Sequence, residues 1–321
     1  MKLLRIALPA LLGAMAALSA TVAAAADYPS RPIEMIVPSS AGGGTDVMAR
    51  LFADTAKKYL PQPIVVSNKP GASGGIAMTE VQRAVPDGYK IGVLISELAI
   101  IPHLNMTKVT TADFIPLARL NGDPGLIAVR ADAPWQSIDD LLARARQQPG
   151  SVTMGNAGTG SIWHLAAAAV EEKTGVKFNH VPYQGAAPSV MALVGGHVDA
   201  ITVSPAEIGS FVAAGKVRVL VSMAERRLGA PYDKVPTFKE KGTDLVLGTW
   251  RGLGVPLGTP PEVVQVLREA TRKTAEDPAF RDALLRANLL PAYLDGVQFQ
   301  AFMNSQSDYF KTLLGSLHIQ K

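Results

Sequence analysis

The chain has 321 residues, of which 31 are Lys or Arg and 27 are Asp or Glu, giving a formal net charge of +4, and it has no cysteine. The lack of cysteine excludes disulfides, thiolate metal ligands and a cysteine nucleophile. The basic residues form no cluster interleaved with aromatic residues, so the composition offers no support for a nucleic-acid-binding protein.

The first 26 residues have the layout of a secretory signal peptide. A short basic start at 1–5 is followed by an apolar stretch over 6–22 and a run of alanines that satisfies Ala-x-Ala at Ala24 and Ala26. An N-terminal membrane anchor is the alternative, but this stretch is short and rich in alanine. No later segment reaches about 18 continuous apolar residues. We therefore expect cleavage after residue 26 and an exported, soluble mature protein.

Short apolar runs alternate with helix-like stretches in the first half of the mature chain. We expect strands at 33–37, 64–67 and 89–95, with helices at 46–59 and 75–85 between them. A strand-helix-strand order of this kind predicts a parallel sheet with crossover helices.

The second half repeats this alternation. We expect strands at 126–129 and 151–155, a helix at 137–147 between them, and a strongly helical run at 162–173. Further elements are expected at 178–181, 189–195, 200–203, 208–214, 217–222, 252–255, 261–274, 278–288 and 297–314.

The length and the repeated pattern predict two α/β domains of roughly 150 residues each. The second α/β unit begins near Leu126 and ends near Leu245. The first domain is therefore expected to be discontinuous, comprising 27–125 and 246–321, and the second domain is expected to comprise 126–245.

One device occurs in each half: a strand, a Gly-rich loop and the start of a helix. The first loop, 38–46, reads PSSAGGGTD, with Thr45 or Asp46 as the expected N-cap, and the second, 155–161, reads GNAGTGS. Free N–H groups and the helix dipole make such loops suited to anions. Ligands of open α/β sheets bind beyond the carboxyl ends of the strands, so we expect a cleft in which both loops face one anion. The alternative is that each loop is only a tight turn.

An exported serine hydrolase is the competing interpretation. The segment 71–75 matches Gly-x-Ser-x-Gly, the nucleophile elbow, with Ser73 as the nucleophile. However, 68–70 separates the preceding strand from this turn, and no base stands out among His103, His164, His180 and His197. The chain has no nucleotide P-loop, no Gly-x-Gly-x-x-Gly after the first strand and no His-Glu-x-x-His, so we expect neither a cofactor nor a metal.

Two polar residues keep alternative interpretations. His164 lies one turn into the helix after the second loop and either faces the cleft or is structural. Asp199 follows the segment 195–198 and is either a ligand contact or a turn residue that fixes the next strand.

The order of short motifs along the chain resembles the Bug-type extracytoplasmic solute receptors, the substrate-binding components of tripartite tricarboxylate transporters. The motifs are YPSRPI at 28–33, PSSAGGGTD at 38–46, NKPGA at 68–72, PDGY at 86–89, GTGS at 158–161 with His164, VPYQG at 181–185, GGHVD at 195–199, and Trp250 through PLGTP at 256–260. Each motif is weak alone, but the ordered series spans almost the whole mature chain.

This resemblance implies a periplasmic-binding-protein type II clamshell, with two α/β domains and a ligand cleft between them. It also implies a periplasmic monomer without catalysis, which holds a small organic carboxylate by backbone N–H groups, hydroxyls and ordered water and presents it to a membrane permease or a sensor. The residues expected at the ligand are Ser39, Ser40, Gly42, Gly43, Gly44, Thr45, Asp46, Ser96, Glu97, Gly158, Thr159, Gly160, Ser161, His164, Tyr183, Gln184 and Ser204.

Three residues bear on how far the resemblance extends. Ser39 stands where the family loop often has an aromatic residue, so stacking over the ligand is not expected from it. Glu97 either faces the cleft, where it would repel a second carboxylate and favour an amine or hydroxyl, or points outward. Arg251 is expected to be an exposed surface residue, with a partnership to Glu97 or to a distal carboxylate as the alternative.

Overall fold

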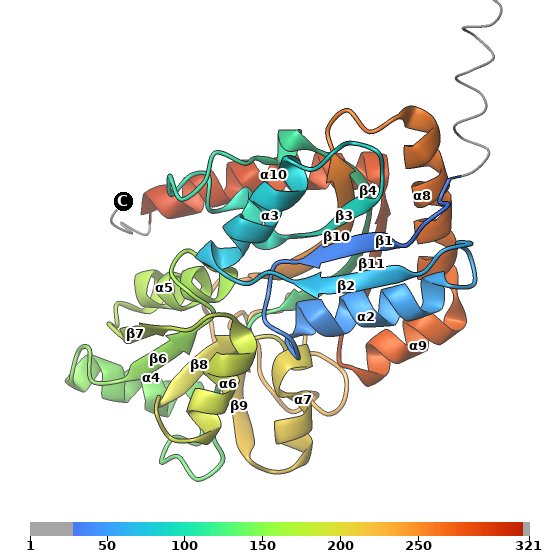
Figure 1. Cartoon of the computed structure of the whole chain (residues 1–321). Coiled ribbons are helices and arrows are strands. Elements are labelled where there is room, and N and C mark those ends of the chain that lie inside the picture. Colours follow the sequence, from blue (N-terminus) through green and yellow to red (C-terminus); the bar gives the residue numbers. More distant parts are fainter. Residues whose placement is uncertain (1–27, 317–321) are drawn as a thin grey trace, which may run out of the picture.

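Two β-sheets, each covered by helices, organise the part of the chain that the computed structural model describes, residues 28–316 (Figure 1). The predicted signal peptide, 1–26, lies outside these described residues. Within 28–316, no helix is both long and apolar enough to cross a membrane.

The first sheet has six strands in the order β11-β4-β10-β3-β1-β2. β1 pairs in parallel with β2 and with β3, whereas β10 is antiparallel to both β3 and β4, and β11 is antiparallel to β4. The strands are β1 (Ile33–Val37), β2 (Ile64–Asn68), β3 (Lys90–Ile95), β4 (Phe114–Pro124), β10 (Gly248–Pro256) and β11 (Pro291–Asp295).

Helices cover both faces of this sheet because its side chains alternate between the faces. Met35 and Val37 pack with the helices α2, α8 and α9, while Ile36 lies in the core that includes α3 and α10. These helices are α2 (Gly44–Ala56), α3 (Gly75–Gln82), α8 (Pro261–Glu276), α9 (Pro278–Arg286) and α10 (Gly296–Ser316). We call this sheet and its helices the six-stranded lobe.

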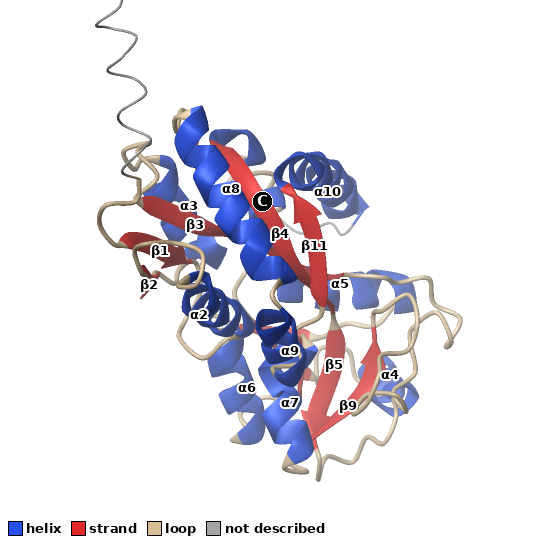
Figure 2. Ribbon diagram, turned by 90° about the vertical axis from the view of Figure 1, so that its right-hand side faces the viewer, coloured by secondary structure: helices blue, strands red, loops and turns tan. Residues whose placement is uncertain are grey.

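The second sheet has five strands in the order β7-β6-β8-β5-β9. Leu126 and Ala128 face the core with α6 and α7, and Ile127 and Val129 face the core with α4 and α5. The elements are β5 (Leu126–Arg130), β6 (Thr153–Asn156), β7 (Asn179–Pro182), β8 (Ala200–Val203), β9 (Val217–Ser222), α4 (Ile138–Gln147), α5 (Ile162–Thr174), α6 (Ala186–Val194) and α7 (Pro205–Ala213). We call this group the five-stranded lobe; Figure 2 shows β5, β9, α4, α6 and α7 below the strands of the first sheet.

The α/β class with two sheets is confirmed, but the sheets are mixed and not purely parallel. The parallel prediction holds for β1, β2 and β3, whose crossovers are α2 and α3. In the second sheet, where the same alternation was expected, β6 is parallel to β7 and β8, but β5 is antiparallel to β8 and β9. The sequence pattern missed β4 and β11, and both contain or begin with a proline that obscures a strand signal.

Candidate ligand-binding site

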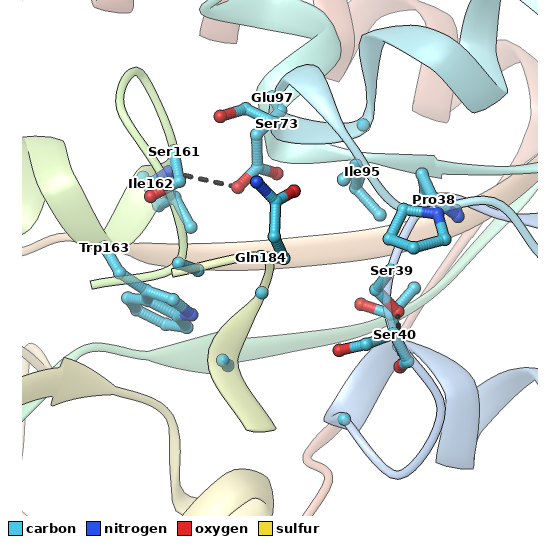
Figure 3. Close-up of a pocket in the computed structure, with 18 of the residues that line it drawn as sticks. Pro38, Ser39, Ser40, Ser73, Ile95, Glu97, Ser161, Ile162, Trp163 and Gln184 are labelled. Atoms are coloured by element: carbon cyan, nitrogen blue, oxygen red, sulfur yellow. Dashed lines mark hydrogen bonds between the residues drawn. The ribbon is translucent and has the colours of Figure 1, made fainter. Parts of the chain in front are cut away.

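A cavity of about 320 Å³ lies between the two lobes and is lined by loops from both (Figure 3). Its volume suits a small organic molecule. The six-stranded lobe contributes Pro38, Ser39, Ser40, Gly43, Gly44, Thr45, Pro70, Gly71, Ala72, Ser73, Gly74, Ile95, Glu97, Met106, Thr249 and Arg251. The five-stranded lobe contributes Ala157, Gly158, Thr159, Ser161, Ile162, Trp163, Pro182, Tyr183, Gln184, Gly185, Ala186 and Glu207.

The first Gly-rich loop leads from β1 into α2, and the helix begins at Gly44 with Gly43 as its N-cap. The prediction that Thr45 or Asp46 caps this helix is wrong, because both already lie in its first turn. Asp46 instead accepts hydrogen bonds from the Gly42 N–H at 2.9 Å and from Arg50. Burial opposes ionisation of Asp46, but its hydrogen bonds from Arg50, Gly42 and Asn68 together lower its pKa. Asp46 therefore holds the loop in place through its hydrogen bond from the Gly42 N–H.

The N-terminus of α2 presents unused hydrogen-bond donors at the cavity. A helix's first N–H groups have no intrahelical acceptor, and those of Gly44, Thr45 and Asp46 find no other acceptor within residues 28–316. Gly44 and Thr45 line the cavity, and Asp46 follows them in the same turn. The Ser40 hydroxyl, also on a cavity-lining residue, is buried without a hydrogen-bond partner in the described chain. This end of the cavity can accept an anion.

The second Gly-rich loop, between β6 and α5, is different because most of its donors are already used. Asn156 accepts from the Gly158 N–H at 3.0 Å, and the Gly160 N–H donates to Nδ1 of His164 at 3.2 Å. Ser161 is the N-cap of α5, and its Oγ accepts from the His164 N–H. The N–H of Thr159 has no acceptor among the described residues. Among the same residues the Ala157 N–H also has no acceptor, so the loop leaves two backbone donors open, one on each side of Gly158.

Glu97 faces the cavity and is not directed outward. It lies in the short 3₁₀ turn Ser96–Ala99 after β3 and is 7% exposed. Its Oε1 accepts from the Ile162 N–H at the start of α5 at 3.0 Å, a bond drawn in Figure 3, and its Oε2 accepts from the Ser96 hydroxyl. Burial raises the pKa of the Glu97 carboxyl. A carboxylate of the protein thus occupies the N-terminus of α5.

Arg251 is buried, at 2% exposed, so the prediction of a surface arginine is wrong. It lies on β10, which is flanked by β3 and β4 and therefore has no solvent-facing edge. Its Nε donates to the Thr45 hydroxyl at 2.9 Å, and its two terminal nitrogens donate to Asp123 at 2.6 Å and Glu207 at 3.3 Å. Burial raises the pKa of both carboxyls, and the guanidinium opposes this. The alternative, a hydrogen-bonded pair of Arg251 with Glu97, is not formed either; Arg251 bonds to this network instead.

Eleven of the predicted site residues line the cavity: Ser39, Ser40, Gly43, Gly44, Thr45, Glu97, Gly158, Thr159, Ser161, Tyr183 and Gln184. The other six are not in the lining, and they make hydrogen bonds that hold the lining residues and their loops in place: Gly42, Asp46, Ser96, Gly160, His164 and Ser204.

His164 and Asp199 are structural in this arrangement. The His164 ring contacts the His180 ring edge-on at 4.9 Å, and burial together with His180 lowers the pKa of His164 to about 4. Neutral His164 accepts the Gly160 N–H at Nδ1 and so supports the second loop. Asp199 accepts hydrogen bonds from the backbone and the hydroxyl of Thr153 and joins β8 to β6.

Ser73 lines the cavity but has no base beside it. Its hydroxyl donates to the Thr159 carbonyl at 2.7 Å, across the two lobes, and no histidine is hydrogen-bonded to it in the described chain. Ser73 has a positive φ of 50°, which a non-glycine residue rarely adopts. Among the described residues there is also no group of three or more His, Asp or Glu that could hold a metal ion.

Several cavity residues were not predicted. Glu207 could have been found from the pattern Ser204-x-x-Glu207 before an apolar run, which predicts a capping box at a helix start, and the structure has this box at α7. Thr249 carries no such signal in the sequence; its hydroxyl meets that of Ser96 at 3.0 Å because β10 lies beside β3. Trp163 lines the cavity because α5 begins there, a position that only the fold reveals.

A cavity between two α/β lobes, lined by loops from both, is the architecture of a solute-binding receptor. Residues 48–319 match the family described as tripartite tricarboxylate transporter family receptor. The chain belongs to this family, as the order of its motifs predicts. A relative described as the UPF0065 protein in the gbd 5' region of Cupriavidus necator is 34% identical over 297 residues, which cover 92% of this chain and 90% of that protein.

Solved structures agree with this assignment. A TctC solute binding protein from Polaromonas, solved without ligand, is 52% identical with a TM-score of 0.67 and covers 90% of this chain and 99% of its own. The periplasmic binding protein BugD is 29% identical with a TM-score of 0.87, over 92% of this chain and 100% of its own. The periplasmic-binding-protein fold and the Bug-type resemblance are confirmed.

Two similar structures hold dicarboxylates. A Rhodopseudomonas palustris protein solved with adipate is 27% identical, with a TM-score of 0.86 over 91% of this chain and 98% of its own. MatC from the same organism, with bound malate, is 27% identical, with a TM-score of 0.83 over 89% of this chain and 100% of its own.

Proposed function

We propose that this protein is a periplasmic receptor that captures a small organic carboxylate in the cavity between the lobes and delivers it to a membrane transporter. The observation that carries this proposal is the unpartnered set of donors at the N-terminus of α2, the N–H groups of Gly44, Thr45 and Asp46 with the Ser40 hydroxyl beside them. The adipate and malate in the two R. palustris structures support a carboxylate as the ligand class.

Both Gly-rich loops take part in this proposal, with unequal roles. The carboxylate lies against the N-terminus of α2, and the backbone of Gly158 and Thr159 closes over it from the five-stranded lobe. Charge-assisted hydrogen bonds contribute about 1.5–3 kcal/mol each. Part of the free energy from three such bonds offsets the cost of ordering the ligand and closing the lobes. The net binding free energy is then consistent with a micromolar Kd, about −8 kcal/mol.

Closure would occur between the two domains predicted from the sequence, 27–125 with 246–321 and 126–245. The chain crosses between the sheets around Gly125 and again between β9 and β10, and these two crossings are the proposed hinge. The ligand-free Polaromonas structure superposes less well than the more distant BugD, which a change in the angle between the lobes would produce. The receptor is proposed to act as a monomer, without a cofactor, and to present its closed form to a permease or a sensor.

A thermal-shift screen of residues 27–321 against small carboxylates and their amides tests the proposal. At a hundred times its Kd, a ligand adds about 2.7 kcal/mol to the free energy of unfolding. We expect a large rise in melting temperature with at least one acid and none with the compound in which every carboxyl is an amide. A screen in which no carboxylate raises the melting temperature would refute the proposed function.

The second candidate, a serine hydrolase using Ser73, is favoured only by the Gly-x-Ser-x-Gly match and by the position of Ser73 at the cavity. The hydroxyl's donation to the Thr159 carbonyl and the missing base count against it.

A further inference from the structure

The two helix N-termini at the cavity are not equivalent, and this difference bears on the ligand. The inference below rests on the proposed function, since it concerns the far end of the carboxylate that the cavity would hold. At α2, the N–H groups of the first turn have no acceptor in the described chain. At α5, the Ile162 N–H already donates to Glu97 and the His164 N–H to Ser161. The Trp163 N–H in the same turn has no acceptor among the described residues, so α5 keeps one open donor against three at α2, and the α2 end is the more open to an anion.

Glu97 keeps hydrogen-bonding capacity toward the cavity after these contacts. A carboxylate has two oxygens with about four acceptor positions. Each oxygen of Glu97 accepts one hydrogen bond from another residue, from Ile162 and from Ser96, and the carboxyl also accepts one from the Glu97 N–H. The Glu97 side chain is buried and also lines the cavity. A hydrogen-bond donor on the ligand is therefore the natural partner for its remaining acceptor capacity.

The charges around the cavity point the same way. Its lining includes two acidic residues, Glu97 and Glu207, and one basic residue, Arg251. All three guanidinium nitrogens of Arg251 already donate to the protein, and two of them donate to carboxylates, those of Asp123 and Glu207. The single positive charge of Arg251 is therefore already shared between two buried carboxyls of the protein, which leaves it a weak counter-charge for a second negative charge on the ligand.

We infer that the ligand is a monocarboxylate whose opposite end carries an N–H donor, an ammonium or a carboxamide, and that Glu97 is the residue that selects this end. A dicarboxylate would place a second carboxyl beside Glu97, whose ionisation burial already opposes, and the two could not both be ionised in this poorly solvated site without strong repulsion. An ammonium or amide would instead donate to Glu97 and satisfy a buried acceptor. The inferred ligand therefore differs in its second end group from the adipate and malate held by the two similar structures.

Isothermal titration of the mature protein with matched sets of ligands tests this inference. Each set has a common carbon frame and three end groups: succinate, succinamate and γ-aminobutyrate; adipate, adipamate and ε-aminocaproate; terephthalate, terephthalamate and p-(aminomethyl)benzoate. In at least one set, we expect the half-amide or the amino acid to bind at least tenfold more tightly than the dicarboxylate. Dicarboxylates that bind as tightly as their partners, or more tightly, would overturn the inference and leave the proposed function standing. If no member of any set binds, the inference fails, and the thermal-shift screen decides separately whether the proposed function fails with it.

The Glu97→Gln variant separates a selecting carboxylate from a merely structural one. Glutamine keeps the shape and can still accept the Ile162 N–H, but it lacks the charge. We expect the preference for the amino acid over the dicarboxylate to fall at least tenfold in this variant. Glu171→Gln is the matched control, because Glu171 lies on α5, pairs with His180 and is absent from the cavity lining. An unchanged preference in Glu97→Gln would overturn the assignment, and the order of affinities in the wild type decides the ligand class should the variant fail to fold.

Discussion

Replacing Arg251 with methionine is expected to destabilise the protein by about 3–5 kcal/mol, the usual loss when one partner of a buried ion pair is removed. The geometry sets this range. Arg251 is 2% exposed, and its removal leaves Asp123 and Glu207 buried without their shared cation and takes away the donor to Thr45. Methionine fills part of the space but cannot replace any of the three hydrogen bonds.

Thermal denaturation at neutral pH measures this loss, which corresponds to a fall of roughly 10 °C in melting temperature. The deficit should shrink as the pH is lowered, because burial raises the pKa of both stranded carboxyls and protonation removes their charge. Arg272→Met is the control, since Arg272 also makes two ion pairs, with Glu269 and Glu276, but is well exposed. Its melting temperature should stay close to that of the wild type. Equal melting temperatures for the two variants would refute the proposed importance of the buried network.

Three further predictions follow from contacts around the cavity. Between pH 6.5 and 4, the free energy of unfolding of the wild type, measured with urea, should fall by up to about 3 kcal/mol relative to that of His164→Gln. The pKa of His164 is lowered to about 4 in the folded state, so its contribution to stability is complete above pH 6.5 and is lost as the histidine protonates. A constant difference between the two proteins across this range would contradict the prediction. Ser73→Ala should retain ligand binding within about threefold in isothermal titration, since one exchanged hydroxyl contributes only modestly, whereas a detectable esterase activity that the variant loses would favour the hydrolase. Gly44→Ala should lower the melting temperature more than Gly43→Ala, because a Cβ at Gly44 would lie 2.9 Å from the held Arg251 guanidinium while one at Gly43 meets nothing nearer than 3.6 Å. The reverse order would count against the close packing of α2 on Arg251.

The sequence predicts much of this fold because its local patterns agree with the tertiary structure. The apolar runs at β1, β3 and β5 and the Gly-rich loops that follow β1 and β6 are strong local signals, and the structure has them at nearly the expected residues. The antiparallel strands β4 and β11 were missed. Their pairing depends on segments far apart in the chain, and no periodicity within a single strand encodes it.

The site was predicted where it depends on loops and missed where it depends on packing. The loops bearing Ser40 and Thr159 were identified because Gly-rich turns at helix starts have a recognisable composition. The direction of Glu97 and the burial of Arg251 depend on which strands flank β3 and β10. A single sequence does not contain this pairing, so the direction of Glu97 was left open and the expectation of an exposed Arg251 was wrong.

The most direct test of the central claim is a crystal structure of residues 27–321 with the carboxylate that raises the melting temperature most in the screen. We predict that the ligand's carboxylate oxygens lie within about 3.2 Å of the backbone nitrogens at the start of α2, Gly44–Asp46, and of the Ser40 hydroxyl. A carboxylate bound outside the cavity, or one that displaces Glu97 from the Ile162 N–H and leaves the N-terminus of α2 empty, would contradict this account.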